Sequence, residues 1–240
     1  MISFSLKPGE IPTEVADLDL LRQIEGSPEL AEALQPMSAK RRMDFLLGRY
    51  CAVRAIQRLL GTEAVPLVAV SHDRAPIWPD GIVGSITHTV NFVSACVARS
   101  TEIRGLGIDC EARISMIPEK REMSLQLIQD LEQLALVEEE KVLASTLEGA
   151  LEYRDFVLLV FSAKESVYKC FQPLVRRYID FKEVAISSVK FHEAVHPAEI
   201  TGTFTFVLLN DLDVNFRRGR TFAGSFTFSA QFVETCFRVA

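Results

Sequence analysis

The chain has 240 residues, of which 48% are hydrophobic and 24% charged, and its formal net charge is −6. This composition is typical of a globular protein whose core is arranged in one large domain or two smaller ones. The negative charge argues against a general nucleic-acid binder, because phosphate backbones require clustered lysine and arginine. It leaves room for one local basic pocket that accepts a small phosphorylated ligand.

In the first part of the chain, one long helix is the clearest predicted element. The first 35 or so residues are predicted to be irregular because prolines interrupt them; these are Pro8, Pro12, Pro28 and Pro36. A helix is predicted from about Ser38 to Leu60, with Ser38 as N-cap and Gly61 after the last turn. Strands are predicted over Pro66–Val70, Gly84–Thr87 and Asn91–Ala98, with a loop over 71–84 that contains Asp73.

After Ser100 the chain begins a second series of elements. A strand is predicted over Gly105–Cys110, a polar and partly acidic helical region over Pro118–Thr146, and a helix over Glu152–Phe171. β-branched and aromatic residues predict antiparallel strands over Val184–Val189, Thr201–Leu208 and Thr221–Val239.

The order of a helix followed by strands therefore occurs twice, although no strict sequence repeat is visible. It indicates two related halves, residues 1–103 and 104–240. Runs of strands after each helix favour an α+β fold over a doubly wound parallel sheet.

Location and redox state can also be inferred from the pattern. The first ten residues contain Lys7 and Glu10 and do not resemble a signal peptide. The longest strongly apolar run, Phe156–Phe161, is far shorter than the roughly 20 residues that cross a bilayer. A cytoplasmic location is the expectation. The cysteines form no CxxC pair and are predicted to be small buried apolar residues: Cys51, Cys96, Cys110, Cys170 and Cys236.

The most informative segment is Gly105–Glu111. Side chains alternate between the faces of a strand, so Asp109 and Glu111 should share one face while Ile108 and Cys110 occupy the other. Two carboxylates after two glycines could hold a hard cation. Without further signals, a solvated strand edge explains the same pattern.

A second segment places Glu165 and Lys169 one turn apart on a predicted helix. The simplest interpretation is a surface ion pair. The neighbouring run Phe156–Phe161 is apolar nearly all round, however, which predicts a buried helix whose charges need partners. A third carboxylate beside Asp109 and Glu111 would repel each by about 1–4 kcal/mol at contact distance. A divalent cation removes that conflict.

A third segment ends at His88, which follows the small residues Gly84 and Ser85. A lone histidine at a strand end is more often a structural hydrogen-bonding group than a ligand or base. The small residues nevertheless leave room for a ligand. Arg49 on the earlier helix could reach the same pocket and bind an anion.

Taken in order, these segments resemble the Sfp-type 4′-phosphopantetheinyl transferases, and the variant is most similar to the enterobactin-synthase component D branch. The motifs that carry the resemblance are Phe45-Leu46-x-Gly48-Arg49, Trp78-Pro79-x-Gly81, Gly84-Ser85-Ile86-Thr87-His88, Gly107-Ile108-Asp109-Cys110-Glu111, Phe161-Ser162-Ala163-Lys164-Glu165-Ser166 with Lys169, and Pro173-Leu174-Val175. Each is weak alone, but their common order is specific.

The resemblance implies two pseudo-twofold-related α+β halves, with coenzyme A and Mg²⁺ in the cleft between them. The N-terminal half would hold the nucleotide end of coenzyme A, and the C-terminal half the metal and catalytic groups. The implied metal ligands are Asp109, Glu111 and Glu165. The implied coenzyme A-binding residues are Arg41, Arg49, Ser85, Thr87, His88, Lys164 and Lys169.

The implied reaction transfers phosphopantetheine from coenzyme A to a serine of an apo acyl, peptidyl or aryl carrier protein and releases 3′,5′-ADP. Glu165 and Lys169 are the candidate catalytic residues, and Mn²⁺ could replace Mg²⁺. The branch resemblance favours siderophore or other nonribosomal-peptide synthesis, with fatty-acid and polyketide carriers as alternatives.

Two other functions and one docking hypothesis stay open at the level of sequence. The chain could be another metal-dependent phosphoryl enzyme, or a non-catalytic module that binds coenzyme A or a carrier protein. The region Pro118–Thr146 is a candidate carrier-docking surface, and a plain solvated helix explains it equally well. A monomer is expected, because two related halves can cover each other.

Overall fold

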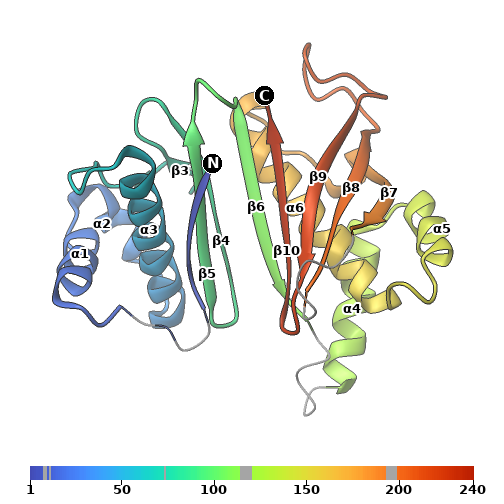
Figure 1. The fold of residues 1–240 in the computed structure, drawn as a ribbon, viewed down its shortest axis with the longest axis horizontal. Helices are drawn as coiled ribbons and strands as arrows, with labels where there is room; N and C mark the ends of the chain where they lie inside the picture. The colour runs from blue at the N-terminus through green and yellow to red at the C-terminus, as the bar shows by residue number, and fades with distance from the viewer. Residues whose placement is uncertain (8–9, 11, 73, 114–120, 193–198) are drawn as a thin grey trace. The chain divides into compact units, whose positions relative to one another are not determined.

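The computed structural model describes residues 1–7, 10, 12–72, 74–113, 121–192 and 199–240. Three positions named above, Pro8, Asp73 and the start of the helical region at 118–120, lie outside these residues. The chain divides into two compact units, Met1–Leu106 with Val239–Ala240, and Gly107–Arg238. Each contains helices and antiparallel strands (Figure 1), so the predicted α+β class is confirmed. None of the helices in the described ranges is long and apolar enough to cross a membrane.

The first unit combines a three-stranded sheet with three helices. Its helices are α1 (Val15–Glu25), α2 (Pro28–Leu34) and α3 (Ala39–Leu60). Its strands are β1 (Ile2–Leu6), β2 (Ala69–Val70), β3 (Pro76–Ile77), β4 (Ile82–Thr89) and β5 (Phe92–Arg99). The sheet has the order β1-β5-β4 with antiparallel neighbours, and β2 pairs with β3.

The prediction that the first 35 residues are irregular is wrong, because this segment forms β1, α1 and α2. Pro28 is the first residue of α2, where its fixed φ suits a helix and its missing N–H has no partner to lose. Ile24, Leu30 and Leu34 are then buried in the core. These short helices are stabilised by burial in the core, which the positions of prolines in the sequence do not reveal.

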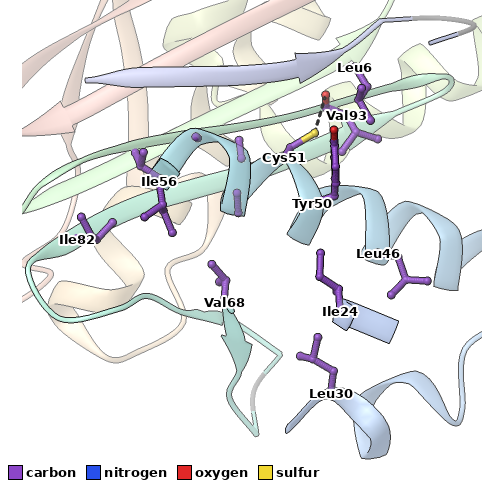
Figure 2. Packing of buried hydrophobic residues seen from close by; sticks show 14 of the residues in the cluster. Leu6, Ile24, Leu30, Leu46, Tyr50, Cys51, Ile56, Val68, Ile82 and Val93 are labelled. Carbon is purple, nitrogen blue, oxygen red and sulfur yellow. Dashed lines mark hydrogen bonds between the residues drawn. The ribbon is translucent and has the colours of Figure 1, made fainter. Parts of the chain in front are cut away.

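Helix α3 has the predicted limits. The Ser38 side chain accepts a hydrogen bond from the Arg41 amide, and Gly61 ends the helix in the left-handed conformation with φ of 68°. Figure 2 shows Tyr50, Cys51 and Ile56 of this helix within the hydrophobic cluster of the unit.

The second unit is built on a five-stranded sheet of order β6-β10-β9-β8-β7. Its strands are β6 (Gly105–Ala112, beginning in the first unit), β7 (Val184–Phe191), β8 (Ile200–Leu208), β9 (Thr221–Phe228) and β10 (Phe232–Val239, ending in the first unit). Its helices are α4 (Arg121–Ala135), α5 (Glu138–Thr146), α6 (Tyr153–Val175) and the short 3₁₀ helix η3 (Phe181–Glu183).

Several predicted elements have different limits in the structure. The strand predicted over Pro66–Val70 is reduced to the two residues of β2. The helical region divides into α4 and α5, and the predicted last strand is a hairpin of β9 and β10. The Ser229 hydroxyl accepts a hydrogen bond from the Phe232 amide and so closes that hairpin turn. Helix α6 continues past Phe171 and contains Pro173 in its last turn, where the missing N–H removes one hydrogen bond to the Lys169 carbonyl oxygen.

Helix α6 packs on this sheet through aromatic rings and a polar pair. The Phe171 ring lies 5.2 Å from the Phe237 ring and 5.4 Å from the Phe222 ring, measured between centroids. The Ser162 and Thr235 hydroxyls lie 2.9 Å apart and are buried. These contacts fix α6 against β9 and β10, and thereby the direction of its charged side chains.

All five cysteines are free thiols. Four are buried as predicted, whereas Cys236 is only half-buried on β10.

Candidate active site

Strand β6 and helix α6 make close backbone contact at Gly107. A Cβ atom at this position would lie 1.8 Å from the Ser166 carbonyl oxygen and 2.8 Å from the Cys170 amide nitrogen. Glycine is required here because a side chain would overlap the backbone of α6. The contact sets β6 against the middle turns of α6, where the charged side chains of the site lie.

At this contact one carboxylate pairs with an ammonium group, and two more carboxylates interact with both groups electrostatically. The Lys169 Nζ atom lies 2.6 Å from Asp109 Oδ1 and donates a second hydrogen bond, of 3.3 Å, to the Ile108 carbonyl oxygen. Asp109 is buried, while Glu111 and Glu165 are half-buried. The strand residues that alternation assigns to one face therefore meet two residues that the helix places one turn apart.

The electrostatics of the cluster reflect both burial and like charge. The pKa of Glu111 is raised to about 8, mainly by burial and also by the Asp109 and Glu165 charges, with the Lys169 charge opposing them. Burial also raises the pKa of Glu165, with the Asp109 charge in the same direction and Lys169 against it. The pKa values of Glu111 and Glu165 are thus both raised by burial and by the Asp109 charge, and the single Lys169 charge does not cancel these effects.

This donor set fits a divalent cation. Carboxylate oxygens are the ligands that Mg²⁺ and Mn²⁺ prefer, and a dication offsets the burial and repulsion that raise these pKa values. Among the residues that the structure describes, no group of three or more His, Cys, Asp or Glu side chains is placed so that it could hold a metal ion. Metal binding at Asp109, Glu111 and Glu165 is therefore a hypothesis based on donor chemistry and electrostatics.

An apolar pocket of about 150 Å³ adjoins the cluster and shares Glu165 with it. Its walls include Tyr168, Tyr178, Ile179 and Phe181. The Tyr168 and Tyr178 rings are 5.9 Å apart, and Tyr178 is 66% exposed. The pocket is suited to an uncharged chain that must reach Glu165.

Lys164, which the family resemblance associates with phosphate, is held inside the second unit. Its side chain is 1% exposed, and its Nζ atom lies 2.8 Å from Glu140 Oε2 and 2.7 Å from the Ala135 carbonyl oxygen. These contacts give Lys164 a structural role, because they occupy its ammonium group away from solvent.

The first unit contains a larger pocket of about 620 Å³. Arg41, Arg49 and His88, which sequence reasoning selects, all line it together with His72 and Arg74. The pocket has acidic lining as well, from Glu29, Glu32 and Asp44. Its basic side can accept phosphate oxygens.

Arg49 is the most buried cation of this pocket, with 5% of its surface exposed. Its Nε atom donates to the Val68 carbonyl oxygen at 3.1 Å, and its guanidinium carbon lies 4.2 Å from the centre of the Phe45 ring. The Nη2 atom is buried without a hydrogen-bond partner in the described part of the chain. Burial lowers the pKa of Arg49 to about 10, so the group stays charged at neutral pH and an anion would satisfy it.

Ser85 and Thr87 do not line this pocket, unlike Ile86 and His88. The four residues alternate along β4, so Ser85 and Thr87 lie on the opposite face of the sheet. Their side chains therefore do not reach the ligand space of this pocket.

Sequence reasoning did not select the pocket residues His72 and Arg74. They come from the connection between the short strands β2 and β3, whose path depends on tertiary pairing. Their only sequence signal is two basic side chains close together in a loop.

Family models match both parts of the chain. The 4′-phosphopantetheinyl transferase N-terminal domain matches residues 29–98, and the 4′-phosphopantetheinyl transferase superfamily matches residues 105–210. The chain belongs to the 4′-phosphopantetheinyl transferase superfamily. The resemblance inferred from the ordered motifs is thereby confirmed.

Individual 4′-phosphopantetheinyl transferases show the extent of the similarity. The enzyme PptT of Mycobacterium tuberculosis is 33% identical over 160 residues, which cover 67% of this chain and 64% of PptT. Npt of Nocardia iowensis is 32% identical over 182 residues, which cover 74% of each chain. Enterobactin synthase component D of Escherichia coli is 32% identical over 158 residues, or 66% of each chain. The match thus spans slightly less than two thirds of PptT.

Proposed function

We propose that this chain transfers the phosphopantetheine arm of coenzyme A to a serine of an apo carrier protein. The observation that carries the proposal is the gathering of Asp109, Glu111 and Glu165 around Lys169 in a chain of this superfamily. Enterobactin synthase component D among its relatives favours a siderophore or other nonribosomal-peptide pathway. The sequence-based expectations of a cytoplasmic location and a monomer belong to the same proposal.

The proposed reaction is a phosphoryl transfer. The serine hydroxyl oxygen forms a bond to the β-phosphorus of coenzyme A. The bond from that phosphorus to the bridging oxygen breaks, and 3′,5′-ADP leaves with the electron pair. Glu165 accepts the serine proton directly or through a water, and Lys169 stabilises charge on the leaving phosphate and supplies a proton to it. The roles match the burial and mutual proximity of these two side chains.

Asp109, Glu111 and Glu165 would hold the divalent cation, Mg²⁺ or Mn²⁺. When bound, such an ion would offset the negative charge on the pyrophosphate oxygens of coenzyme A.

The two ends of coenzyme A differ in chemistry, and so do the two pockets. We assign the phosphorylated nucleotide end to the first-unit pocket, where the buried Arg49 together with Arg41 and His88 supports anion binding. We assign the uncharged pantetheine arm to the apolar pocket beside Glu165, which Tyr168 and Tyr178 line.

The activity test uses intact-protein mass spectrometry. The chain is incubated with coenzyme A, Mg²⁺ and several apo carrier proteins, and the carrier should gain the mass of phosphopantetheine. Glu165→Gln should reduce the transfer rate by about 100-fold or more, as expected for loss of a general base or metal ligand. Glu199→Gln, on the chain just before β8, is the control and should transfer normally. Absence of a mass shift on every carrier would reject the transferase proposal in favour of a binding module.

Helices α4 and α5 remain the proposed docking surface for the carrier. They expose Leu125, Leu127, Leu134 and Val142, which are between 47% and 67% accessible to solvent. Exposed apolar side chains on otherwise polar helices are a common feature of protein interfaces.

Replacing these side chains should weaken carrier recognition alone. We expect Leu127→Ser with Leu134→Ser, two changes on the same face of α4, to raise the carrier KM at least about fivefold, since buried apolar contacts contribute about 1 kcal/mol or more each. The KM for coenzyme A should not change. Val214→Ser, a change at an even more exposed residue (75%) between β8 and β9, is the control. An unchanged carrier KM would exclude docking at α4 and α5.

A further inference from the structure

Glu140 is a fully buried carboxylate, with 0% exposure, in the first turn of α5. Its Oε2 atom accepts hydrogen bonds of 2.8 Å from the Val137 amide and from Lys164 Nζ. Its Oε1 atom accepts a hydrogen bond of 2.7 Å from the Ile186 amide on β7. One side chain therefore connects α5, α6 and β7 and has both oxygens satisfied.

Lys164 extends this connection to a fourth element. Its Nζ atom also donates to the carbonyl oxygen of Ala135, the last residue of α4. Carbonyl groups at a helix end carry partial negative charge and favour a cation. The turn of α6 that carries Lys164 is thus attached to the end of α4, the start of α5 and β7.

The next residue along α6 is Glu165, which belongs to the carboxylate cluster. Successive residues on an α-helix are separated by about 100° of rotation, so their side chains leave the axis in different directions. Lys164 points to the α4–α5 side, while Glu165 interacts electrostatically with Asp109 and Lys169. The contacts of Lys164 therefore restrict rotation of α6 about its axis at the position next to Glu165.

The contact at Gly107 holds α6 from another direction. The backbone of β6 lies directly against the Ser166 carbonyl group, one residue beyond Glu165. The two contacts, one polar and one steric, flank Glu165 in the sequence. Together they define both the approach of α6 to β6 and its rotation.

We infer that Glu140 is a positioning residue for the metal site, acting through Lys164 to direct Glu165 toward Asp109 and Glu111. This inference rests on the proposed function, because it presumes that these carboxylates bind a divalent cation. Glu140 does not touch the cluster, so its variants leave every proposed metal ligand in the chain.

Another ion pair on α6 provides a matched control. Asp155, in the first turn of the helix, is 3% exposed and accepts a hydrogen bond of 3.1 Å from Arg113 Nε. Both pairs attach α6 to its surroundings, but Asp155 lies ten residues before Glu165. If buried ion pairs contribute only to stability, Glu140→Gln and Asp155→Asn should behave alike.

The experiment measures Mn²⁺ binding to the full chain by electron paramagnetic resonance, with circular dichroism as a check of folding. Wild type should bind Mn²⁺ at a site that Asp109→Asn removes. Glu140→Gln should raise the Kd about tenfold or more, the size typical of outer-shell changes at metal sites, while Asp155→Asn stays within about twofold. The Mg²⁺ concentration for half-maximal transfer should also rise more in Glu140→Gln than in Asp155→Asn. Equal Mn²⁺ affinity in the Glu140 and Asp155 variants would overturn the inference.

A double variant keeps the test valid if Glu140→Gln fails to fold. Glu140→Leu with Lys164→Met removes both charges together, so that no unpaired charge remains buried. It should fold and still bind Mn²⁺ about tenfold more weakly, even though loss of a nearby cation favours Mn²⁺ binding. Wild-type affinity in this variant would also overturn the inference.

The results distinguish this inference from the proposed function. If wild type transfers phosphopantetheine and binds Mn²⁺, but the Glu140 variants bind it normally, only the positioning role is rejected. If wild type binds no Mn²⁺ at a site sensitive to Asp109→Asn, the proposed metal site is rejected and the positioning role with it.

Discussion

The pKa of Glu111 reflects two influences that act in the same direction, burial and nearby like charge. Its pKa is raised to about 8, first by burial and then by Asp109 and Glu165, although Lys169 opposes the shift. A glutamate in this setting is largely protonated at neutral pH and ionises when a cation arrives. At the proposed metal site, Glu111 would therefore link proton release to metal binding.

We therefore expect Mn²⁺ affinity to depend on pH. Below pH 8 the cation must displace a proton from Glu111, so affinity should fall by up to about tenfold per pH unit. Above pH 8 this dependence should level off. Titration calorimetry in two buffers of different ionisation enthalpy measures the released proton directly.

The Glu111→Gln variant tests whether Glu111 is the source of the released proton. This variant should bind Mn²⁺ more weakly and lose the part of the pH dependence that is centred near 8. Equal wild-type affinity at pH 6 and pH 8 would contradict the assignment of Glu111 as a proton-linked ligand.

At the scale of secondary-structure elements, the site depends on how β6 and α6 approach each other. Gly107 permits the backbones to meet, and the Ser162–Thr235 and Phe171–Phe237 contacts hold the helix on the same sheet. The cluster is therefore a product of packing between two elements rather than of either one alone.

Gly107→Ala tests this packing. Its methyl group would meet the Ser166 carbonyl oxygen at 1.8 Å, so β6 and α6 must separate, at a cost of about 2–3 kcal/mol in the free energy of unfolding. Because the cluster is formed by the same two elements, Mn²⁺ affinity should fall in parallel. Urea denaturation and Mn²⁺ titration measure the two effects.

Gly149→Ala is the control for this variant. Gly149 has φ of 86°, and no atom lies within 4 Å of the position that an added methyl group would take, so alanine should cost about 1 kcal/mol through backbone strain. Mn²⁺ affinity should stay normal. If Gly107→Ala is no more destabilising than this control, the close contact does not restrain α6.

On the scale of the whole molecule, the two units carry complementary chemistry. The first has a basic pocket around the buried Arg49, and the second has the carboxylate cluster and an apolar pocket. The family models match both units, in residues 29–98 and 105–210. The proposed reaction requires all three environments.

Ligands should therefore stabilise the folded chain, and the metal should contribute separately from coenzyme A. At 100 times its Kd a ligand adds about 2.7 kcal/mol, which corresponds to an increase in Tm of about 5–10 °C for a chain of this size. Differential scanning fluorimetry with coenzyme A, with and without Mg²⁺, measures both increments.

Asp109→Asn should lose the Mg²⁺ increment and keep most of the coenzyme A increment, and EDTA should have the same effect on wild type. It should also abolish transfer. A Mg²⁺ increment that survives in Asp109→Asn would place the metal elsewhere.

The sequence alone determined the features that depend on neighbours along the chain. Helical spacing, the Ser38 cap and Gly61 gave the limits of α3, and strand alternation grouped Asp109 with Glu111. The ordered motifs identified the superfamily, which the family models confirm. These signals are local, because periodicity, caps and short motifs are set by residues close in sequence.

Only the tertiary structure decided which distant residues meet. The burial of Glu140 occupies Lys164, and strand pairing places Ser85 away from the pocket that His72 and Arg74 line. Local patterns could not predict these outcomes, since a buried charge takes whichever partner the packing of separate elements brings to it. The sequence thus determined which acidic and basic residues were candidates, and packing decided which of them share a site.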